Sequence, residues 1–281
     1  MSRGAQVVIV VLLVAVVGLG GLLLARGREA PAPAQGEAAA ASDTLVVYAP
    51  CGMSSPIAVA TQKFRQANPG LKVQVVFDNA IVLVRKIRAG DRPDVFMSPG
   101  EMEMKQLTEE GYIDGGTIKD FGTLDLVVIA PNKTKGLDSI QGLTSPSIKT
   151  ISLADPKYNS IGYYAEEALK TMGLWDKLQS KLLLREYPLE AVTLATDGQV
   201  DAGITFLTCP LDTNPEMADA SDVRIVETIP RDPYPPIRLQ VAMLKGTKQR
   251  ELGQKYIDFM TSEQGQQAVA TNGILPAKVI P

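Results

Sequence analysis

The sequence contains no histidine. Histidine is the usual general base near neutral pH and the commonest transition-metal ligand, so its absence excludes histidine-dependent catalytic triads and histidine-ligated zinc sites. A block of basic residues is also missing, because 28 Lys and Arg stand against 31 Asp and Glu, for a net charge of −3. Nucleic-acid binding needs clustered cations that displace counterions, so we expect no nucleic-acid partner.

Acid–base pairs are missing as well. Asp155, Glu186 and Asp201 have no candidate base or nucleophile near them in the sequence. General acid–base and nucleophilic catalysis both need such a partner within hydrogen-bond reach. We therefore expect a protein that is not an enzyme and that holds no cofactor.

Charged residues are absent from residues 7–25, a run of 19 mostly aliphatic residues. A helix of this length, at about 1.5 Å per residue, just spans a hydrocarbon core of about 30 Å, and the run exceeds the ~7–15 residues of a cleavable signal core. We therefore predict that residues 1–26 form a signal anchor, with a cleaved signal peptide as the alternative. Arginines on both sides of the run leave its orientation open. Residues 27–42, almost all Ala, Pro, Gly, Gln and Glu, predict a flexible spacer.

From Thr44 onward, short runs rich in β-branched residues alternate with helix-like segments. Such alternation predicts right-handed crossovers and a mainly parallel sheet with both faces covered, which is the α/β class. A second set of units and a return segment indicate two lobes joined by two crossings. The first set comprises 45–50, 56–67, 72–78, 82–90 and 93–99. The second comprises 124–131, 149–156, 163–173, 188–198, 201–208 and 223–230, followed by the return at 238–246 and a helical tail at 248–270.

Several strand-to-helix junctions carry helix start signals. Ser55 and Ser98 each stand before a proline, a pattern typical of a capping hydroxyl followed by the first helical residue, and Asn159 opens a third helix in the same way. Each alone is typical of an ordinary cap. Ligands of such sheets bind beyond the carboxyl ends of the strands, where helix N-termini offer unpaired N–H groups, so three converging junctions predict a binding site.

Six segments occur in a characteristic order and spacing: VVYAP (46–50), RKIRAGDRPDVFMSP (85–99), the segment at 154–178, DAGITF (201–206), the return at 234–247 and the segment at 259–277. In these segments the chain resembles the molybdate-binding proteins of ABC importers, a branch of the type II periplasmic substrate-binding proteins, over 44–278. The resemblance implies two α/β lobes with a hinge and a central cleft, which close on a small solute. It places 43–126 and 240–281 in lobe 1 and 127–239 in lobe 2.

The function implied by this resemblance is solute capture outside the cytoplasm. The protein would be monomeric, periplasmic or extracytoplasmic, and either tethered to the cytoplasmic membrane or secreted after cleavage. It would hold a small inorganic anion of the molybdate or tungstate kind and deliver it to an ABC permease in the membrane.

The resemblance also identifies the binding loops. Members of the family hold a tetrahedral oxyanion with uncharged donors, among them two Ser hydroxyls and one Tyr hydroxyl, and this sequence has Gly52, Ala80 and Phe206 at those positions. Each lost hydrogen bond to a buried oxyanion is worth about 1.5–3 kcal/mol, so backbone N–H groups would have to carry more of the binding. A carboxylate at Asp78 would repel a dianion unless it points away or is neutralised. The expected ligand-binding residues are Cys51, Gly52, Met53, Asp78, Asn79, Ala80, Ser98, Ile161 and Phe206.

Cys51 and Cys209, the two cysteines of the chain, fall in facing loops if this fold holds. Three interpretations stay open: small buried residues, a disulfide formed outside the cytoplasm, or thiolate ligands of a thiophilic metal or metalloid, with Met53 or Met97 as further ligands. The metal interpretation supplies the alternative function. In that alternative the chain is a membrane-tethered sensor or receptor of the same fold, which binds a soft metal ion or another small solute.

Overall fold

The computed structural model describes residues 44–211, 222–270 and 273–277. The expected signal anchor at 1–26 and the spacer at 27–42 lie outside the described residues and stay predictions. Within the described part of the chain, no helix is both long enough and apolar enough to cross a membrane.

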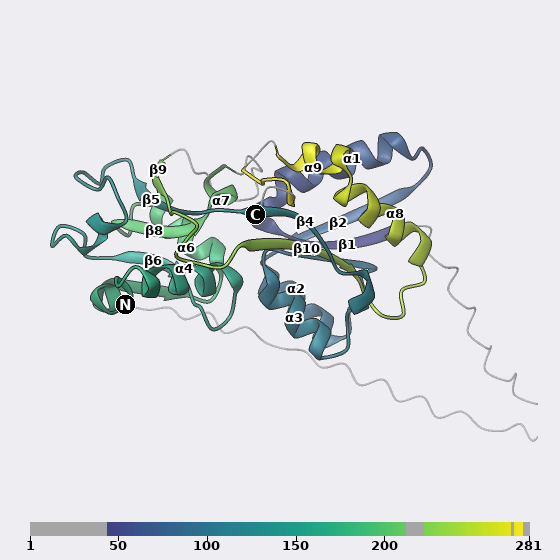
Figure 1. Cartoon of the computed structure of the whole chain (residues 1–281), viewed down its shortest axis with the longest axis horizontal. Helices are drawn as coiled ribbons and strands as arrows, with labels where there is room; N and C mark the ends of the chain where they lie inside the picture. The colour runs from purple at the N-terminus through teal and green to yellow at the C-terminus, as the bar shows by residue number, and fades with distance from the viewer. Residues whose placement is uncertain (1–43, 212–221, 271–272, 278–281) are drawn as a thin grey trace, which may run out of the picture. The chain divides into compact units, whose positions relative to one another are not determined.

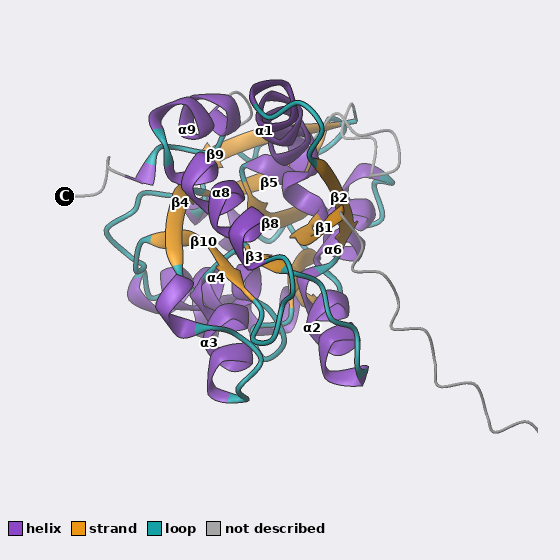
Figure 2. Cartoon of the chain, turned by 90° about the vertical axis from the view of Figure 1, so that its right-hand side faces the viewer, coloured by secondary structure: helices purple, strands orange, loops and turns teal. Residues whose placement is uncertain are grey.

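Five strands form the first sheet, in the order β2-β1-β3-β10-β4. Helices α1, α8 and α9 cover one face of this sheet and α2 and α3 cover the other, as the two views show (Figure 1, Figure 2). We refer to the sheet and these helices as lobe 1. The strands are β1 (Thr44–Pro50), β2 (Lys72–Asp78), β3 (Val95–Ser98), β4 (Lys119–Leu124) and β10 (Ile237–Met243), and the helices are α1 (Ser54–Ala67), α2 (Ala80–Ala89), α3 (Glu101–Glu109), α8 (Arg250–Thr261) and α9 (Glu263–Val269).

The second sheet has the order β7-β6-β8-β5-β9. Helix α4 packs on one face and α6 on the other, and we refer to this group as lobe 2. The strands are β5 (Leu126–Pro131), β6 (Ile151–Ala154), β7 (Leu182–Arg185), β8 (Ala202–Phe206) and β9 (Val223–Thr228). The helices are α4 (Ser160–Thr171), α5 (Trp175–Leu178), α6 (Pro188–Thr196) and α7 (Thr208–Leu211).

The continuous apolar runs of the sequence are strands buried on both faces. In β3, Val95 and Met97 join the core cluster that contains α1 and α8, whereas Phe96 between them joins the cluster under α2 and α3. In β5, Val128 packs in the cluster with α4, and Val127 and Ile129 pack against α6. Since successive side chains of a strand point to opposite faces, apolar residues are needed at every position of such a strand.

The expectation of mainly parallel sheets needs a correction, because both sheets are mixed. In lobe 1, β10 is antiparallel to β3 and β4, and in lobe 2, β5 is antiparallel to β8 and β9. β10 and β5 are the strands that follow the two crossings between the lobes. The chain enters each of them directly from the other lobe and not through a crossover helix, so it runs against its neighbours.

The two crossings are joined to each other. Asp125 lies between β4 and β5, and Arg231 lies between β9 and β10. The guanidinium of Arg231 donates from Nε to Oδ1 of Asp125 at 2.6 Å and from Nη2 to Oδ2 at 3.0 Å. Tyr234 adds a third contact, since its hydroxyl accepts from the N–H of Leu126 at 3.3 Å. This two-pronged ion pair couples the crossings at the expected hinge, while the exact lobe boundaries at 126/127 and 239/240 stay a prediction.

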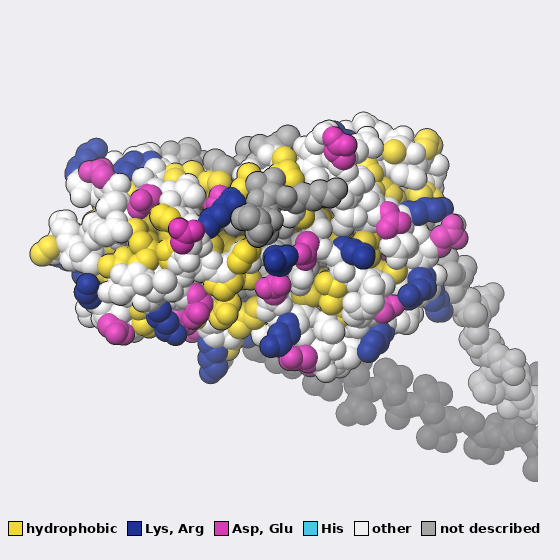
Figure 3. Space-filling model, viewed as in Figure 1, with side chains coloured by type: hydrophobic (Ala, Val, Ile, Leu, Met, Phe, Trp, Pro, Cys, Tyr) yellow, Lys and Arg dark blue, Asp and Glu magenta, His cyan; other side chains and the backbone are white. Residues whose placement is uncertain are grey.

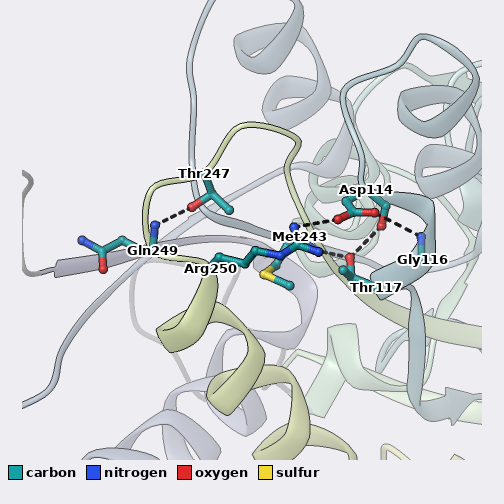
Figure 4. Close-up of polar contacts among 7 residues, drawn as sticks. All are labelled: Asp114, Gly116, Thr117, Met243, Thr247, Gln249 and Arg250. Carbon is teal, nitrogen blue, oxygen red and sulfur yellow. Dashed lines mark hydrogen bonds and ion pairs between the residues drawn. The ribbon is translucent and has the colours of Figure 1, made fainter.

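The return segment is fastened to lobe 1 at the end of β10 and at the start of α8 (Figure 4). The N–H of Met243 donates to Oγ1 of Thr117 at 2.9 Å, and its carbonyl accepts from the N–H of Asp114 at 2.9 Å. Arg250, the first residue of α8, forms an ion pair of 2.8 Å with the same Asp114. The expected single helical tail is two helices, α8 and α9, because the chain leaves the helix at Ser262, whose hydroxyl caps α9.

Candidate functional site

A cavity of about 50 Å³ lies between the lobes, at the carboxyl ends of β1 and β8. One water molecule needs about 10–15 Å³ of such space, so the cavity has room for a solute the size of a few water molecules. Its walls come from both lobes: Pro50, Cys51, Gly52, Met53, Asn79, Ala80, Pro99 and Glu103 from lobe 1, and Asn159, Ser160, Ile161, Pro188, Leu189, Val192, Phe206, Thr208 and Cys209 from lobe 2.

Four helices of nine or more residues begin at this cavity, besides the four-residue α7 at Thr208. Met53, Asn79 and Asn159 are the N-caps of α1, α2 and α4, and Pro188 is the first residue of α6; all four line the cavity. The first N–H groups of a helix have no intrahelical acceptor, and the helix dipole places positive charge at the same end. The cavity therefore favours negative charge without any cationic side chain in its wall.

Of the three predicted helix caps, one is confirmed and two are wrong. Asn159 caps α4, since its Oδ1 accepts from the N–H of Gly162 at 3.0 Å. Ser98 is the last residue of β3, and α3 begins only at Glu101, so Ser98 caps no helix. The helix expected to begin at Pro56 starts at Ser54, with Met53 as its N-cap, so Ser55 already lies inside α1.

Most of the predicted ligand-binding residues come together at the cavity, and two do not. Cys51, Gly52, Met53, Asn79, Ala80, Ile161, Phe206 and Cys209 line it, whereas Asp78 and Ser98 are not part of its wall. The carboxylate of Asp78 forms an ion pair of 2.8 Å with Lys86 and accepts from the N–H of Asn79 at 2.8 Å. The repulsion expected from Asp78 is therefore offset by a cation. The ligand-binding roles themselves stay predictions.

Two polar side-chain atoms in the cavity wall have no hydrogen-bond partner among the described residues. Oγ1 of Thr208, a residue that is 1% exposed, and Oδ1 of Asn79 are buried and unsatisfied. Buried polar atoms are nearly always hydrogen-bonded, so these two atoms mark the polar part of the cavity wall. Thr208 lies two residues after Phe206, the position without its expected hydroxyl, and sequence reasoning overlooked it.

One carboxyl group lines the cavity, and it too was overlooked. Glu103 in α3 is 1% exposed, and its carboxylate accepts from the N–H of Ser160 at 2.9 Å and from the Ser160 hydroxyl. Burial raises the pKa of this carboxyl, while its hydrogen bonds oppose the shift. No Lys or Arg is part of the described cavity wall.

On the face drawn in Figure 3, cationic and anionic side chains are interspersed.

The family model for bacterial extracellular solute-binding proteins matches residues 45–275. The chain belongs to this family. Its proteins bind solutes and are not enzymes, as the sequence predicted. The family's extracellular character agrees with the expected location outside the cytoplasm, while tethering by an N-terminal helix stays a prediction.

Similar proteins support the resemblance to molybdate-binding proteins. Two curated molybdate-binding proteins named ModA are 26% identical (Haemophilus influenzae, covering 83% of this chain and 91% of that protein) and 27% identical (Escherichia coli, covering 75% and 81%). The substrate-binding domain of a putative molybdenum ABC transporter from Clostridium difficile matches with a TM-score of 0.64 at 25% identity, covering 83% of this chain and 98% of that one. The periplasmic molybdate-binding protein of Azotobacter vinelandii matches with a TM-score of 0.68 at 20% identity. The match covers 84% of this chain and 99% of that one, and it shows the type II fold.

The two cysteines of this solute-binding protein face each other across the cavity. A Cβ on Gly52, the neighbour of Cys51, would lie 2.9 Å from Sγ of Cys209, and both residues are thiols. The described residues contain no group of three or more Cys, Asp or Glu that could hold a metal ion, so the two-thiol metal site stays a prediction that the comparisons do not favour.

Cys51 should react slowly with alkylating reagents. Burial, with Cys209 nearby as a lesser cause, raises the pKa of its thiol to about 12. Because only the thiolate reacts, iodoacetamide at about pH 7.5 should alkylate Cys51 of a Cys209→Ser variant, which keeps the burial but loses the lesser cause, roughly 100- to 1000-fold more slowly in the folded protein than in urea. Mass spectrometry of timed samples measures both rates, and equal rates would show that Cys51 is not held in this environment.

Proposed function

We propose that this chain is the solute-binding component of an ABC importer and that it captures a small tetrahedral oxyanion of the molybdate class between its lobes. The observation that carries the proposal is the meeting of four helix N-termini at one cavity between the lobes, where polar atoms of Thr208 and Asn79 have no partner among the described residues. Uncharged donors at helix N-termini suit a dianion, because they supply hydrogen bonds and positive potential without a competing salt bridge. The relatives named for molybdate point to the same class of solute.

The donor set differs from the one that the resemblance implies. Gly52, Ala80 and Phe206 line the cavity but bring no hydroxyl. The hydroxyl of Thr208 provides one donor. A flip of the Asn79 side-chain amide by about 180° exchanges its oxygen and nitrogen, and this places N–H donors where Oδ1 now lies. The backbone N–H groups of Ala80, at the start of α2, and of Ile161, at the start of α4, complete the set, since the N–H groups of Ser160 and Gly162 already donate to Glu103 and Asn159. Selectivity would then follow from the size of the cavity and the placement of these donors.

A screen of anions tests the proposed function. The purified full-length chain should melt at a higher temperature with molybdate or tungstate, and less so with sulfate or phosphate, because a ligand at about 100 times its Kd stabilises the folded state by about 2.7 kcal/mol. Chloride and nitrate, which are not tetrahedral oxyanions, serve as controls. If no tetrahedral oxyanion shifts the melting temperature and calorimetry detects no binding heat, the proposed class of solute is wrong.

We also propose that the chain works on the outer side of the cytoplasmic membrane, with residues 1–26 as its tether and residues 27–42 as the spacer that lets it reach the permease. The apolar run at 7–25 supports this arrangement. Protease added to intact spheroplasts should then release the body of the protein in a soluble form.

A further inference from the structure

Glu103 links the two lobes at the solute cavity. It belongs to α3 of lobe 1, and its carboxylate binds the first residue of α4 in lobe 2 through the N–H and hydroxyl of Ser160. Ser98 contributes a longer hydrogen bond of 3.4 Å. The lobes touch closely here, since a Cβ on Gly100 would lie 2.4 Å from Oγ of Ser160. The carboxylate thus uses the helix N-terminus that an anionic solute would need.

In the part of the chain that the structure describes, no cation balances this carboxylate. Among the described residues, no Lys or Arg forms an ion pair with Glu103. Two cations of α2 line a surface pocket together with Glu103, but both are engaged elsewhere, Arg85 with Glu186 and Arg88 with Glu110. Other titratable or charged groups surround Glu103. Within the lobes these are Tyr164 of α4 and Glu101 of α3, which pairs with Arg238 of β10. Lys157 and Tyr158 line the same surface pocket as Glu103, and Cys51 and Cys209 line the solute cavity with it.

A charged Glu103 and a dianion would compete for the N-terminus of α4. Two like charges this close in a partly buried site repel each other strongly, and a dianion doubles the charge. A protonated Glu103 has no net charge and can donate a hydrogen bond to an anion. Burial already favours this form, since it raises the pKa of the carboxyl.

We propose that Glu103 makes solute capture proton-linked: the cavity accepts a dianion only with Glu103 as the neutral carboxylic acid, so that one proton enters the site with each anion. This inference rests on the proposed function and deepens it. Glu103 then acts as a specificity residue, because it opposes dianion binding wherever it is ionised. It also offers a release mechanism, because loss of the proton restores the repulsion.

Calorimetry of the full-length chain with molybdate tests the linkage. Titrations are run in buffers that differ in ionisation enthalpy, which reveals proton uptake. At pH values above the pKa of Glu103 in the free protein, about one proton should be taken up per anion bound. In the same range the affinity for molybdate should fall about tenfold per pH unit. Molybdate is fully deprotonated from neutral to alkaline pH, so its own titration does not contribute to the slope in this range. Glu103→Gln, which keeps the size and an oxygen acceptor for Ser160, should bind with no proton uptake and at least tenfold more tightly at the alkaline end of this range.

Glu101→Gln is the matched control, because it removes the same charge from an exposed position of the same helix. It should keep the proton uptake and the pH slope of the unaltered protein. Equal slopes in Glu103→Gln and the unaltered protein, or binding without proton uptake, would overturn the inference and leave the proposed function intact. Failure of every variant to bind any oxyanion would instead overturn the proposed function, and this inference with it.

Discussion

Replacing Ala80 with aspartate should abolish oxyanion binding. Ala80 is buried in the cavity wall as the first residue of α2, so the new carboxylate would meet the solute there. Repulsion of about 4 kcal/mol per charge pair at about 4 Å corresponds to an affinity loss of about 1000-fold or more. An acidic residue in the first turn of a helix interacts favourably with the helix dipole, so folding should be preserved. Isothermal titration with molybdate measures the loss.

Ala80→Asn is the control for size. It introduces nearly the same volume without charge, and its amide can donate to an anion. We expect Ala80→Asn to retain most of the affinity that Ala80→Asp loses. Equal affinity in both variants would mean that the solute does not carry negative charge at this wall of the cavity.

Thr208→Val should weaken solute binding and stabilise the free protein at the same time. The hydroxyl of Thr208 is buried without a partner, which costs the folded state about 1 kcal/mol or more, and valine has nearly the same shape. The melting temperature without solute should therefore rise. Loss of a hydrogen bond to an anion should lower the molybdate affinity by about 10- to 100-fold.

Thr123→Val provides a control from the same molecule. Thr123 is the other threonine whose buried Oγ1 has no partner among the described residues, and it lies in β4, outside the cavity wall. The same chemical change there should raise the melting temperature and leave the affinity unchanged. If both valine variants had the same effect on affinity, Thr208 would not be a ligand donor.

Much of the fold could be predicted because its central strands are buried on both faces. The runs at 45–50 and 124–131 contain apolar residues at nearly every position, and they became β1 and β5. Helix α3 and strand β4 were not predicted. Their sequences, EMEMKQLTE and KDFGTL, contain few large apolar residues, and their place depends on contacts with α4, β10 and α8 that are distant in the sequence.

The site was predictable as a meeting of loops but not in its chemistry. The resemblance located Gly52, Ala80 and Phe206, and all three line one cavity. The polar groups that fill the gaps, Thr208 and Glu103, could not be recognised without the spatial neighbours that bury them. One signal was present for Glu103: it stands four residues before Leu107, so in a helix it shares the apolar face with a core residue.

Diffraction from crystals grown with tungstate tests most directly whether the cavity between the lobes is the oxyanion site. Tungsten scatters anomalously, so its position can be found without assumptions about the protein. We expect one strong peak inside the cavity, with oxygens about 3 Å from the hydroxyl of Thr208 and from N–H groups at the starts of α2 and α4. A crystal grown at a saturating tungstate concentration that shows no tungsten in the cavity, or tungsten bound elsewhere, would contradict the account.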